Sequence, residues 1–137
     1  FLGMARDIAQ CHHERWDGNG YPRGVPGEQI PLAARIVSIA DVYDALASRR
    51  VYKEAYSHEK CVEIITGSSG SQFDPGIVEV FLRVAPQFQK IAHRFGNRPE
   101  EGSNASGRKQ DERGAPDRLI TSLLEQSEPP LPLAAVH

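Results

Sequence analysis

Residues 31–48 read PLAARIVSIADVYDALAS, and this stretch decides the fold class. Almost all of its residues are apolar or small, and as a helix they would cover most of its circumference. Pro31 suits a first helical turn, where a missing N–H is not needed. A helix with so little polar surface has to lie inside a core, so we expect it to be the central helix of the domain.

Further helices are predicted around this central one. An amphipathic helix is expected over about residues 1–14, where apolar side chains recur at helical spacing. Ser57 can cap a short helix, and Pro75 can start another that runs to Pro86, followed by a last amphipathic turn or two. No alternation of apolar and polar residues predicts a strand. The predicted class is therefore all-α.

The rest of the chain divides into a loop and a tail. Residues 15–27 are rich in glycine and proline, a composition that breaks both helix and strand, so they must form a structured loop. Residues 97–137 are polar, charged and proline-containing, and they cannot bury enough apolar surface to offset their ordering entropy. We expect one domain over residues 1–96 and a disordered tail over residues 97–137.

Charge and cysteine content exclude several classes of function. The net charge of -2 and the pI of about 6.2 give no field that would attract a nucleic acid polymer. No apolar run approaches the roughly 18 residues that span a bilayer, so no membrane segment is predicted. Cys11 and Cys61 are widely separated among apolar residues. This pattern favours a reducing, cytoplasmic compartment over a disulfide scaffold.

Two adjacent histidines, His12 and His13, fall where the first predicted helix meets the glycine-rich loop. Neighbouring side chains on a helix point about 100° apart, so the pair can serve one metal cluster from two sides. The alternative is purely structural, with one ring satisfied by a backbone carbonyl in the core and the other ring exposed.

Asp41 lies in the middle of the most apolar predicted helix, and Asp44 shares its face at a spacing of three residues. We expect the carboxylate of Asp41 to be buried, which is costly unless it is paired, hydrogen-bonded or bound to a cation. Two explanations stay open at this point. Asp41 either ligates a metal ion or pairs with one of the many arginines.

A basic group follows the central helix at residues 49–53, which read RRVYK. Arginine can bind a phosphate through two parallel hydrogen bonds while the tyrosine ring stacks on a base. The alternative is a solvated helix end, where the helix dipole favours cations in any case.

Taken in order, five blocks of this sequence resemble a known family. They are HHE at 12–14, WDGNGYP at 16–22, IADVYDAL at 39–46, RVYK at 50–53 and FDP at 73–75. Their order and spacing resemble the C-terminal half of an HD-GYP domain, the cyclic di-GMP phosphodiesterase branch of the HD metal-dependent phosphohydrolases. The resemblance covers about residues 1–95 and implies part of an HD-type helical bundle.

The resemblance implies a metal centre in this chain. His12, His13 and Asp41 would be ligands of two or three divalent ions, most often iron or manganese in this family. Asp44 would support that centre or the helix without being a ligand. Such a centre hydrolyses a phosphodiester by lowering the pKa of a bound water and neutralising charge on the phosphoryl group.

The resemblance also assigns a loop and a substrate contact. Gly20, Tyr21 and Pro22 would form the loop that names the family, beside the active-site cleft. Arg50 and Lys53 would contact the phosphates of a cyclic dinucleotide. A signalling protein that docks on the loop is a possible partner by the same resemblance.

This sequence also departs from the family pattern. The family's first half supplies the His-Asp pair, and no His-Asp dipeptide occurs here. Val51 stands where the family usually has proline. We therefore expect a fragment whose catalytic residues lie upstream, together with a receiver or sensor module. Two other functions stay open: a non-catalytic interaction module that uses the loop, and an HD-type phosphohydrolase of another nucleotide.

Overall fold

The computed structural model describes residues 1–48, 54–96, 121 and 123 of the 137-residue chain. Its elements, in order, are α1 (Leu2–Cys11), the 3-10 helix η1 (Gly27–Gln29), α2 (Leu32–Ala47), α3 (His58–Gly67) and α4 (Pro75–Gly96). Within the described ranges the only β interaction is an isolated bridge between Ser69 and Phe73. The prediction of an all-α fold is confirmed.

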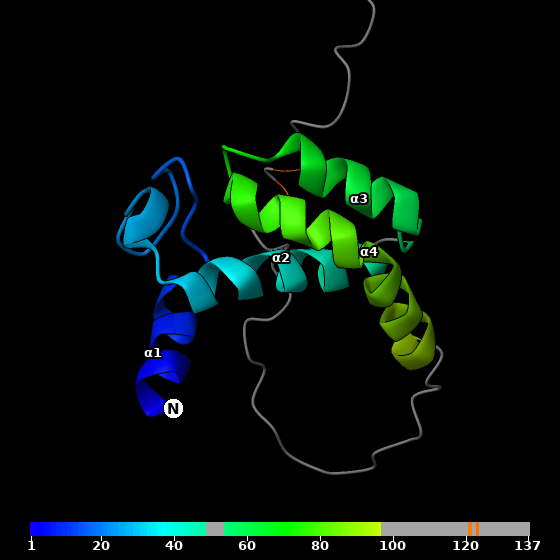
Figure 1. The fold of residues 1–137 in the computed structure, drawn as a ribbon, viewed down its shortest axis with the longest axis horizontal. Helices are drawn as coiled ribbons and strands as arrows, with labels where there is room; N and C mark the ends of the chain where they lie inside the picture. The colour runs from blue at the N-terminus through cyan, green and yellow to red at the C-terminus, as the bar shows by residue number, and fades with distance from the viewer. Residues whose placement is uncertain (49–53, 97–120, 122, 124–137) are drawn as a thin grey trace, which may run out of the picture.

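Among the described residues, α1, α3 and α4 are organised around α2, as predicted. Figure 1 shows α2 running through the middle of the molecule, with α3 and the first part of α4 side by side above it. α1 packs against the beginning of α2 and points away from the other helices (Figure 1). The loop that contains η1 lies at the junction of α1 and α2, which places the two adjacent histidines there as well.

The main core lies between α2, α3 and the first part of α4. Phe73, Leu46, Ile65 and Cys61 are among its most completely buried side chains. Ser57 caps α3 as predicted, because its side chain accepts a hydrogen bond of 3.2 Å from the N–H of Lys60. This core fixes α3 and α4 to the C-terminal half of α2.

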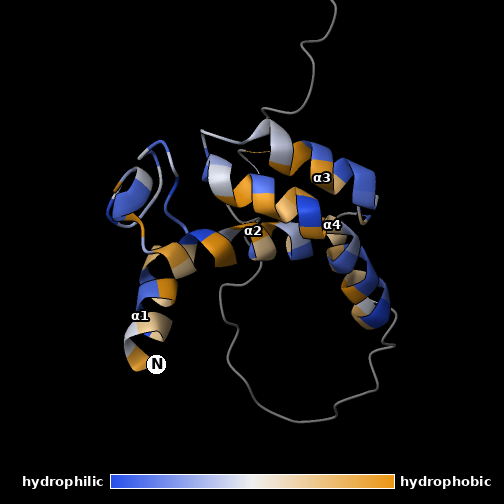
Figure 2. Cartoon of the chain, in the orientation of Figure 1, coloured by the Kyte–Doolittle hydropathy of each residue, from blue (hydrophilic) through white to orange (hydrophobic). Residues whose placement is uncertain are grey.

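A second, smaller cluster joins α1 to the beginning of α2. Cys11, Ile30 and Ala34 are buried in it, and Val25 packs on its edge. Most of α1 lies outside this cluster, and apolar residues along it stay exposed (Figure 2), Leu2 at 82% and Met4 at 58%. Among the described residues, α1 is therefore held in place mainly by contacts of its C-terminal end.

The prediction that a helix ends at Pro86 is wrong, because α4 continues through this residue to Gly96. Proline removes one helical hydrogen bond and bends a helix without necessarily ending it. Figure 1 shows a change of direction along α4. Beyond Pro86, the ring of Phe88 packs edge-on against Tyr43 and Phe81, with ring centroids 5.2 Å apart in both pairs. These contacts hold the second half of α4 against α2.

The expectation that α2 is buried around its circumference is also wrong. Its residues facing α3 and α4 are buried, including Leu46 and Val42, but Leu32 and Ile36 are 53% and 49% exposed. The described helices pack against one side of α2 and leave the other side open. The apolar composition of residues 31–48 predicted the helix correctly but could not indicate which faces the described part of the chain would cover.

The predicted disordered tail falls mostly outside the described residues. Thr121 and Leu123 are the exceptions: both are helical, and Leu123 is 1% exposed within the main core. At Leu123 the chain therefore contributes a side chain to the main core. No helix among the described residues is long and apolar enough to cross a membrane.

Candidate functional site

The structure brings His12 and His13 together directly after α1. Both rings are partly buried, and their centroids lie 3.9 Å apart at an angle of 41°. The Nδ1 atom of His12 lies 2.8 Å from the carbonyl oxygen of Ile8. A carbonyl oxygen only accepts hydrogen bonds, so Nδ1 of His12 carries the proton.

This hydrogen bond determines which nitrogen of His12 can act as a ligand. In the neutral ring, a proton on Nδ1 leaves the lone pair on Nε2, the arrangement that metal-ligating histidines usually show. The same bond is the backbone carbonyl contact that the structural alternative requires. That alternative also expects the second histidine to be exposed, whereas His13 is partly buried and lies against the rings of both His12 and Tyr21.

The aromatic ring of Tyr21 stacks on the ring of His13. The two ring centroids are 4.9 Å apart and nearly parallel, at 18°. The N–H of Tyr21 donates to the carbonyl oxygen of His13 at 3.3 Å, and the Tyr21–Pro22 peptide bond is cis. Tyr21 of the predicted loop thus lies beside His13.

Gly20 lets this loop lie directly on the main chain of the histidine segment. A Cβ atom at this position would be 2.4 Å from the nitrogen of Arg15 and 2.7 Å from two backbone atoms of Glu14. No side chain can be accommodated at such distances from backbone atoms. The requirement for glycine here comes from close packing.

The base of the loop is held by a buried arginine. Arg15 is 8% exposed and makes two hydrogen bonds to the carboxylate of Asp17, at 3.1 and 2.8 Å, and a third to Oε1 of Gln72 at 3.1 Å. The hydrogen bonds from Arg15 hold the pKa of Asp17 below its usual value of 3.8. Main-chain bonds from Trp16 and Asp17 reach the same turn, at Gln72 and Ser71.

Among the described residues, the carboxylates of the central helix do not form a three-ligand group with the histidine pair. Both Asp41 and Asp44 are exposed, so the prediction that Asp41 is buried is wrong. The end of α1 packs near Ala34, and Asp41 follows on the same face of α2 about 10 Å further along. Both carboxylates are thus exposed to solvent in the part of the chain that the structure describes.

The structure does not gather the three predicted ligands into one group. In the part of the chain that the structure describes, no three or more His, Cys, Asp or Glu side chains are placed where they could hold one metal ion. The described residues therefore supply only part of a metal site. They provide two adjacent imidazoles, and the hydrogen bond at Nδ1 of His12 leaves its Nε2 as the atom that can bind an ion. Arg50 and Lys53, the predicted phosphate contacts, and Val51 lie outside the described residues.

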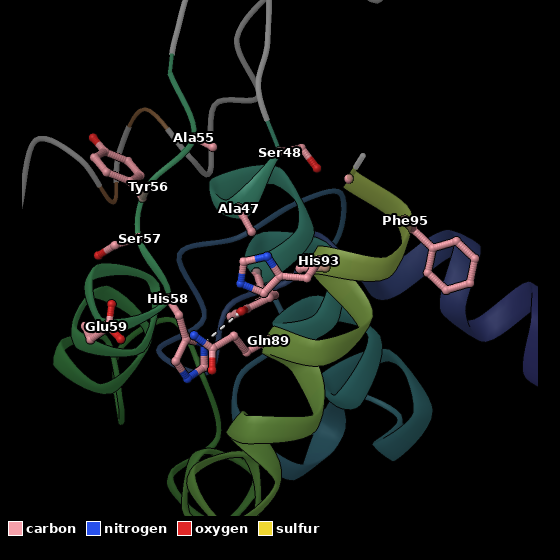
Figure 3. A pocket seen from close by; sticks show the side chains of 13 residues that line it. Ala47, Ser48, Ala55, Tyr56, Ser57, His58, Glu59, Gln89, His93 and Phe95 are labelled. Atoms are coloured by element: carbon pink, nitrogen blue, oxygen red, sulfur yellow. Dashed lines mark hydrogen bonds between the residues drawn. The ribbon is translucent and has the colours of Figure 1, made fainter. Parts of the chain in front are cut away.

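A cavity that the sequence did not predict lies at the other end of α2. It has a volume of about 820 Å³ and is enclosed by the last turns of α2 and α4 and the beginning of α3. Figure 3 shows His58, Gln89 and His93 around it, with a dashed hydrogen bond that reaches His58. This bond joins the hydroxyl of the buried Tyr43 to Nδ1 of His58 at 2.8 Å. Burial, rather than a charge, is the main cause that raises the pKa of Tyr43 above 10.0.

Sequence reasoning missed two buried charged residues, Glu14 and Arg15. Glu14 ends the HHE block and Arg15 follows it, but a charged residue before a glycine-rich loop is usually read as solvated. The useful signal was the loop itself. A tight loop has many backbone N–H groups that are not paired within a helix or strand, and a nearby carboxylate can accept hydrogen bonds from them. A carboxylate of the loop can in turn be bound by an arginine.

Comparison with known proteins identifies the family. Residues 1–77 match the family model described as HD domain, which is more than half of the chain. The chain belongs to the HD domain family, and the signature blocks place it in the HD-GYP type.

The most similar relatives include several named phosphodiesterases. A "Cyclic di-GMP phosphodiesterase" of Vibrio cholerae is 55% identical over 95 residues, which are 69% of this chain and 19% of that protein. The "Cyclic di-GMP phosphodiesterase response regulator RpfG" of Xanthomonas campestris is 46% identical over 95 residues, 69% of this chain and 25% of that protein.

A solved structure is also similar. The crystal structure of a cyclic GMP-AMP specific phosphodiesterase of Vibrio cholerae, V-cGAP3, aligns with a TM-score of 0.50 and 32% identity. The alignment covers 71% of this chain and 26% of that one. The chain thus spans about a fifth to a quarter of the length of these relatives.

Proposed function

We propose that this chain forms part of a metal-dependent phosphodiesterase that hydrolyses cyclic di-GMP. The observation that carries the proposal is the adjacent histidine pair. A backbone carbonyl orients His12, and Tyr21 of the loop over residues 15–27, the Tyr21 loop, stacks on His13. The chain that holds this pair is 55% identical to a named cyclic di-GMP phosphodiesterase over 95 residues. In this proposal His12, His13 and Asp41 are metal ligands. The ions are iron or manganese, and the number per domain is two or three.

Each residue has a distinct task in the proposed reaction. Divalent ions bound there would lower the pKa of a water molecule and neutralise charge on the phosphodiester. His12 presents its Nε2 lone pair because Nδ1 donates to Ile8. Asp41 supplies an anionic oxygen from α2, and Arg50 and Lys53 bind the non-bridging phosphate oxygens. Because the described residues contain no group of three ligands, the centre needs further ligands from outside them.

The compartment and the partners are part of the same proposal. Cyclic di-GMP is an intracellular substrate in this proposal, and a cytoplasmic location agrees with Cys11 and Cys61 lying in two different buried clusters. The Tyr21 loop is partly available to a signalling protein, since Tyr21 is 42% exposed. A receiver or sensor module in the same polypeptide would regulate the hydrolysis.

Metal content of the purified 137-residue chain tests the ligand assignment. We expect bound manganese or iron in the parental chain and its loss in the His12→Ala, His13→Ala and Asp41→Ala variants, measured by mass spectrometry of the metals. His93→Ala is the matched control, because His93 is exposed on α4 and lies at the cavity at the far end of α2. Equal metal content in all variants would show that these three residues are not ligands.

Turnover separates the proposed function from its alternatives. We expect the metal-loaded protein, assayed in the longest form that contains these residues, to release linear dinucleotide or GMP from cyclic di-GMP. A protein that binds metal but hydrolyses no cyclic dinucleotide would refute this function and favour a phosphohydrolase of another nucleotide. A protein that binds neither metal nor nucleotide would favour a non-catalytic interaction module that uses the Tyr21 loop.

A second candidate substrate is 3'3'-cGAMP. It is favoured by the 42% identity, over 90 residues, to a "3'3'-cGAMP-specific phosphodiesterase 2" of Vibrio cholerae. The two substrates differ in one base, so the discrimination depends on base contacts rather than on phosphate contacts. Competition between equal concentrations of the two dinucleotides gives the ratio of kcat/KM values, and a ratio above about tenfold assigns the substrate.

A further inference from the structure

We propose that Glu14 is a positioning residue, which holds the Tyr21 loop so that the ring of Tyr21 fixes the orientation of His13. This inference rests on the proposed function, since it concerns the arrangement of a proposed metal ligand. Glu14 follows the histidine pair directly, yet its carboxylate is directed into the loop.

Glu14 is a buried carboxylate whose partners are backbone groups. It is 3% exposed, and among the described residues it takes part in no ion pair. Its Oε1 accepts a hydrogen bond of 2.7 Å from the N–H of Arg23, and its Oε2 accepts one of 3.3 Å from the N–H of Val25. Hydrogen bonds to an ionised carboxylate are about twice as strong as neutral ones, and they stabilise this buried charge.

The two hydrogen bonds hold the segment that immediately follows Tyr21 and Pro22. On the other side of Tyr21, Gly20 lies against the backbone of Glu14 and Arg15 at distances that exclude a side chain. Tyr21 itself donates its N–H to the carbonyl oxygen of His13. The backbone from Gly20 to Val25 is therefore attached to the histidine segment before, at and after Tyr21.

This attachment restricts the ring of His13. His12 lies against it with centroids 3.9 Å apart, and Tyr21 lies against it at 4.9 Å and 18°. A ring in contact with two neighbouring rings has few rotamers open to it. Both carboxylate oxygens of Glu14 are used by the loop. Glu14 thus acts through Tyr21 and does not reach a metal ion itself.

Nuclear magnetic resonance of the metal-free 137-residue chain tests this directly. The stacked Tyr21 ring shifts the imidazole proton signals of His13, and Tyr21→Ala measures the size of that shift. We expect Glu14→Ala to abolish the same shift and Glu14→Gln, which keeps one acceptor oxygen, to reduce it. The double variant Glu14→Ala, Tyr21→Ala should match either single variant, because both residues act through one contact.

Asp17→Asn is the matched control. Asp17 is a carboxylate in the same loop, but its partners are Arg15 and the N–H of Asn19. If Asp17→Asn removes the His13 shift as fully as Glu14→Ala does, general loosening of the loop explains the effect and the proposal is wrong. An unchanged His13 shift in Glu14→Ala also overturns it. Circular dichroism shows whether each variant is folded. If Glu14→Ala does not fold, the His13 shift in Glu14→Gln tests the proposal instead.

Binding of Mn²⁺ alone, measured by calorimetry, links the contact to the proposed centre. Loss of a residue that orients a ligand typically weakens metal binding by roughly ten- to hundredfold. We expect such a loss in both Glu14→Ala and Tyr21→Ala, and less than about threefold in Asp17→Asn. A parental chain that binds no Mn²⁺ would count against a metal site preformed by this chain alone, and the metal-free His13 shift would still decide the role of Glu14.

Discussion

Arg35 and Asp74 are 39 positions apart in the chain, and their side chains form an ion pair with an N–O distance of 2.7 Å. The two side chains are only 15% and 11% exposed. Arg35 also donates to the carbonyl oxygen of Ile30 at 2.9 Å, and its guanidinium lies 5.8 Å from the centre of the Trp16 ring. One arginine on α2 therefore joins the start of α4, the turn before α2 and the loop that carries Tyr21.

Breaking this ion pair by removing one side chain should cost far more stability than breaking a surface pair of the same length. Removing one partner of a buried pair leaves an uncompensated charge, so we expect Arg35→Ala to lower the free energy of unfolding by about 3–5 kcal/mol. Arg83 and Glu79 are the matched control, because they lie 2.6 Å apart but are 72% and 68% exposed. For Arg83→Ala we expect less than about 1 kcal/mol.

Urea denaturation measures both changes. In the double variant Arg35→Ala, Asp74→Ala, the loss should be smaller than the sum of the single losses by about 1–3 kcal/mol, because the two side chains stabilise each other. Additive losses would show that Arg35 and Asp74 contribute independently.

Substitution of Gly20 should disrupt the loop without affecting the main core. In Gly20→Ala the new Cβ would clash with the backbone of Glu14 and Arg15, so the loop has to move away from the histidine segment. We expect a loss of about 1–3 kcal/mol in the free energy of unfolding, together with loss of the Tyr21 contact to His13. Gly3→Ala is the control, because a Cβ there meets no atom within 4 Å.

Gly3 lies within α1, where alanine is favoured over glycine by about 1 kcal/mol. Gly3→Ala should therefore be neutral or slightly stabilising in the same denaturation experiment. If Gly20→Ala were equally harmless, the close packing of the loop on residues 14–15 would be refuted.

The Arg15–Asp17 pair should make stability depend on acid pH. The folded state lowers the pKa of Asp17 below 3.8, chiefly through its hydrogen bonds with Arg15. The stabilisation is complete above the unfolded pKa of about 3.9 and is lost as pH falls through the lower folded value. Thermal unfolding from pH 6 to pH 2 should show a smaller acid-induced decrease in Asp17→Asn than in the parental chain. Identical pH profiles would show that the folded state does not stabilise the ionised form of Asp17.

Leu123 should behave as a core residue although it lies in a segment of polar composition. Its side chain is 1% exposed within the main core, so Leu123→Ala should cost about 2–5 kcal/mol. Leu82 on α4 is the control, because it is 43% exposed, and Leu82→Ala should cost less than about 1 kcal/mol. Equal and small losses for the two variants would place Leu123 outside the core.

Local sequence determined the helices and where they begin. Ser57 caps α3 with a hydrogen bond to a residue three positions along, and Pro75 begins α4, because both effects act within one helical turn. α1 ends at Cys11 rather than at about residue 14, so the histidine pair lies in the turn that follows it. The signature blocks likewise identified the family, since a block records which residue types occur and at which spacing.

Tertiary structure decided which of these residues are buried and which meet. Asp41 was expected to be buried, but its exposure depends on which helices cover the open side of α2, and a pattern within α2 does not contain that information. α4 continues past Pro86 because contacts of Phe88 with Tyr43 and Phe81 offset the hydrogen bond lost there.

The contacts of the loop also depend on residues far apart in the sequence. The buried carboxylate of Glu14 accepts hydrogen bonds from backbone N–H groups up to 11 positions later, and Arg35 pairs with Asp74 across 39 positions. Residue types and spacing fix what a chain can form within a few turns. Burial and pairing between distant segments depend on how the helices pack, so only the folded chain determines them.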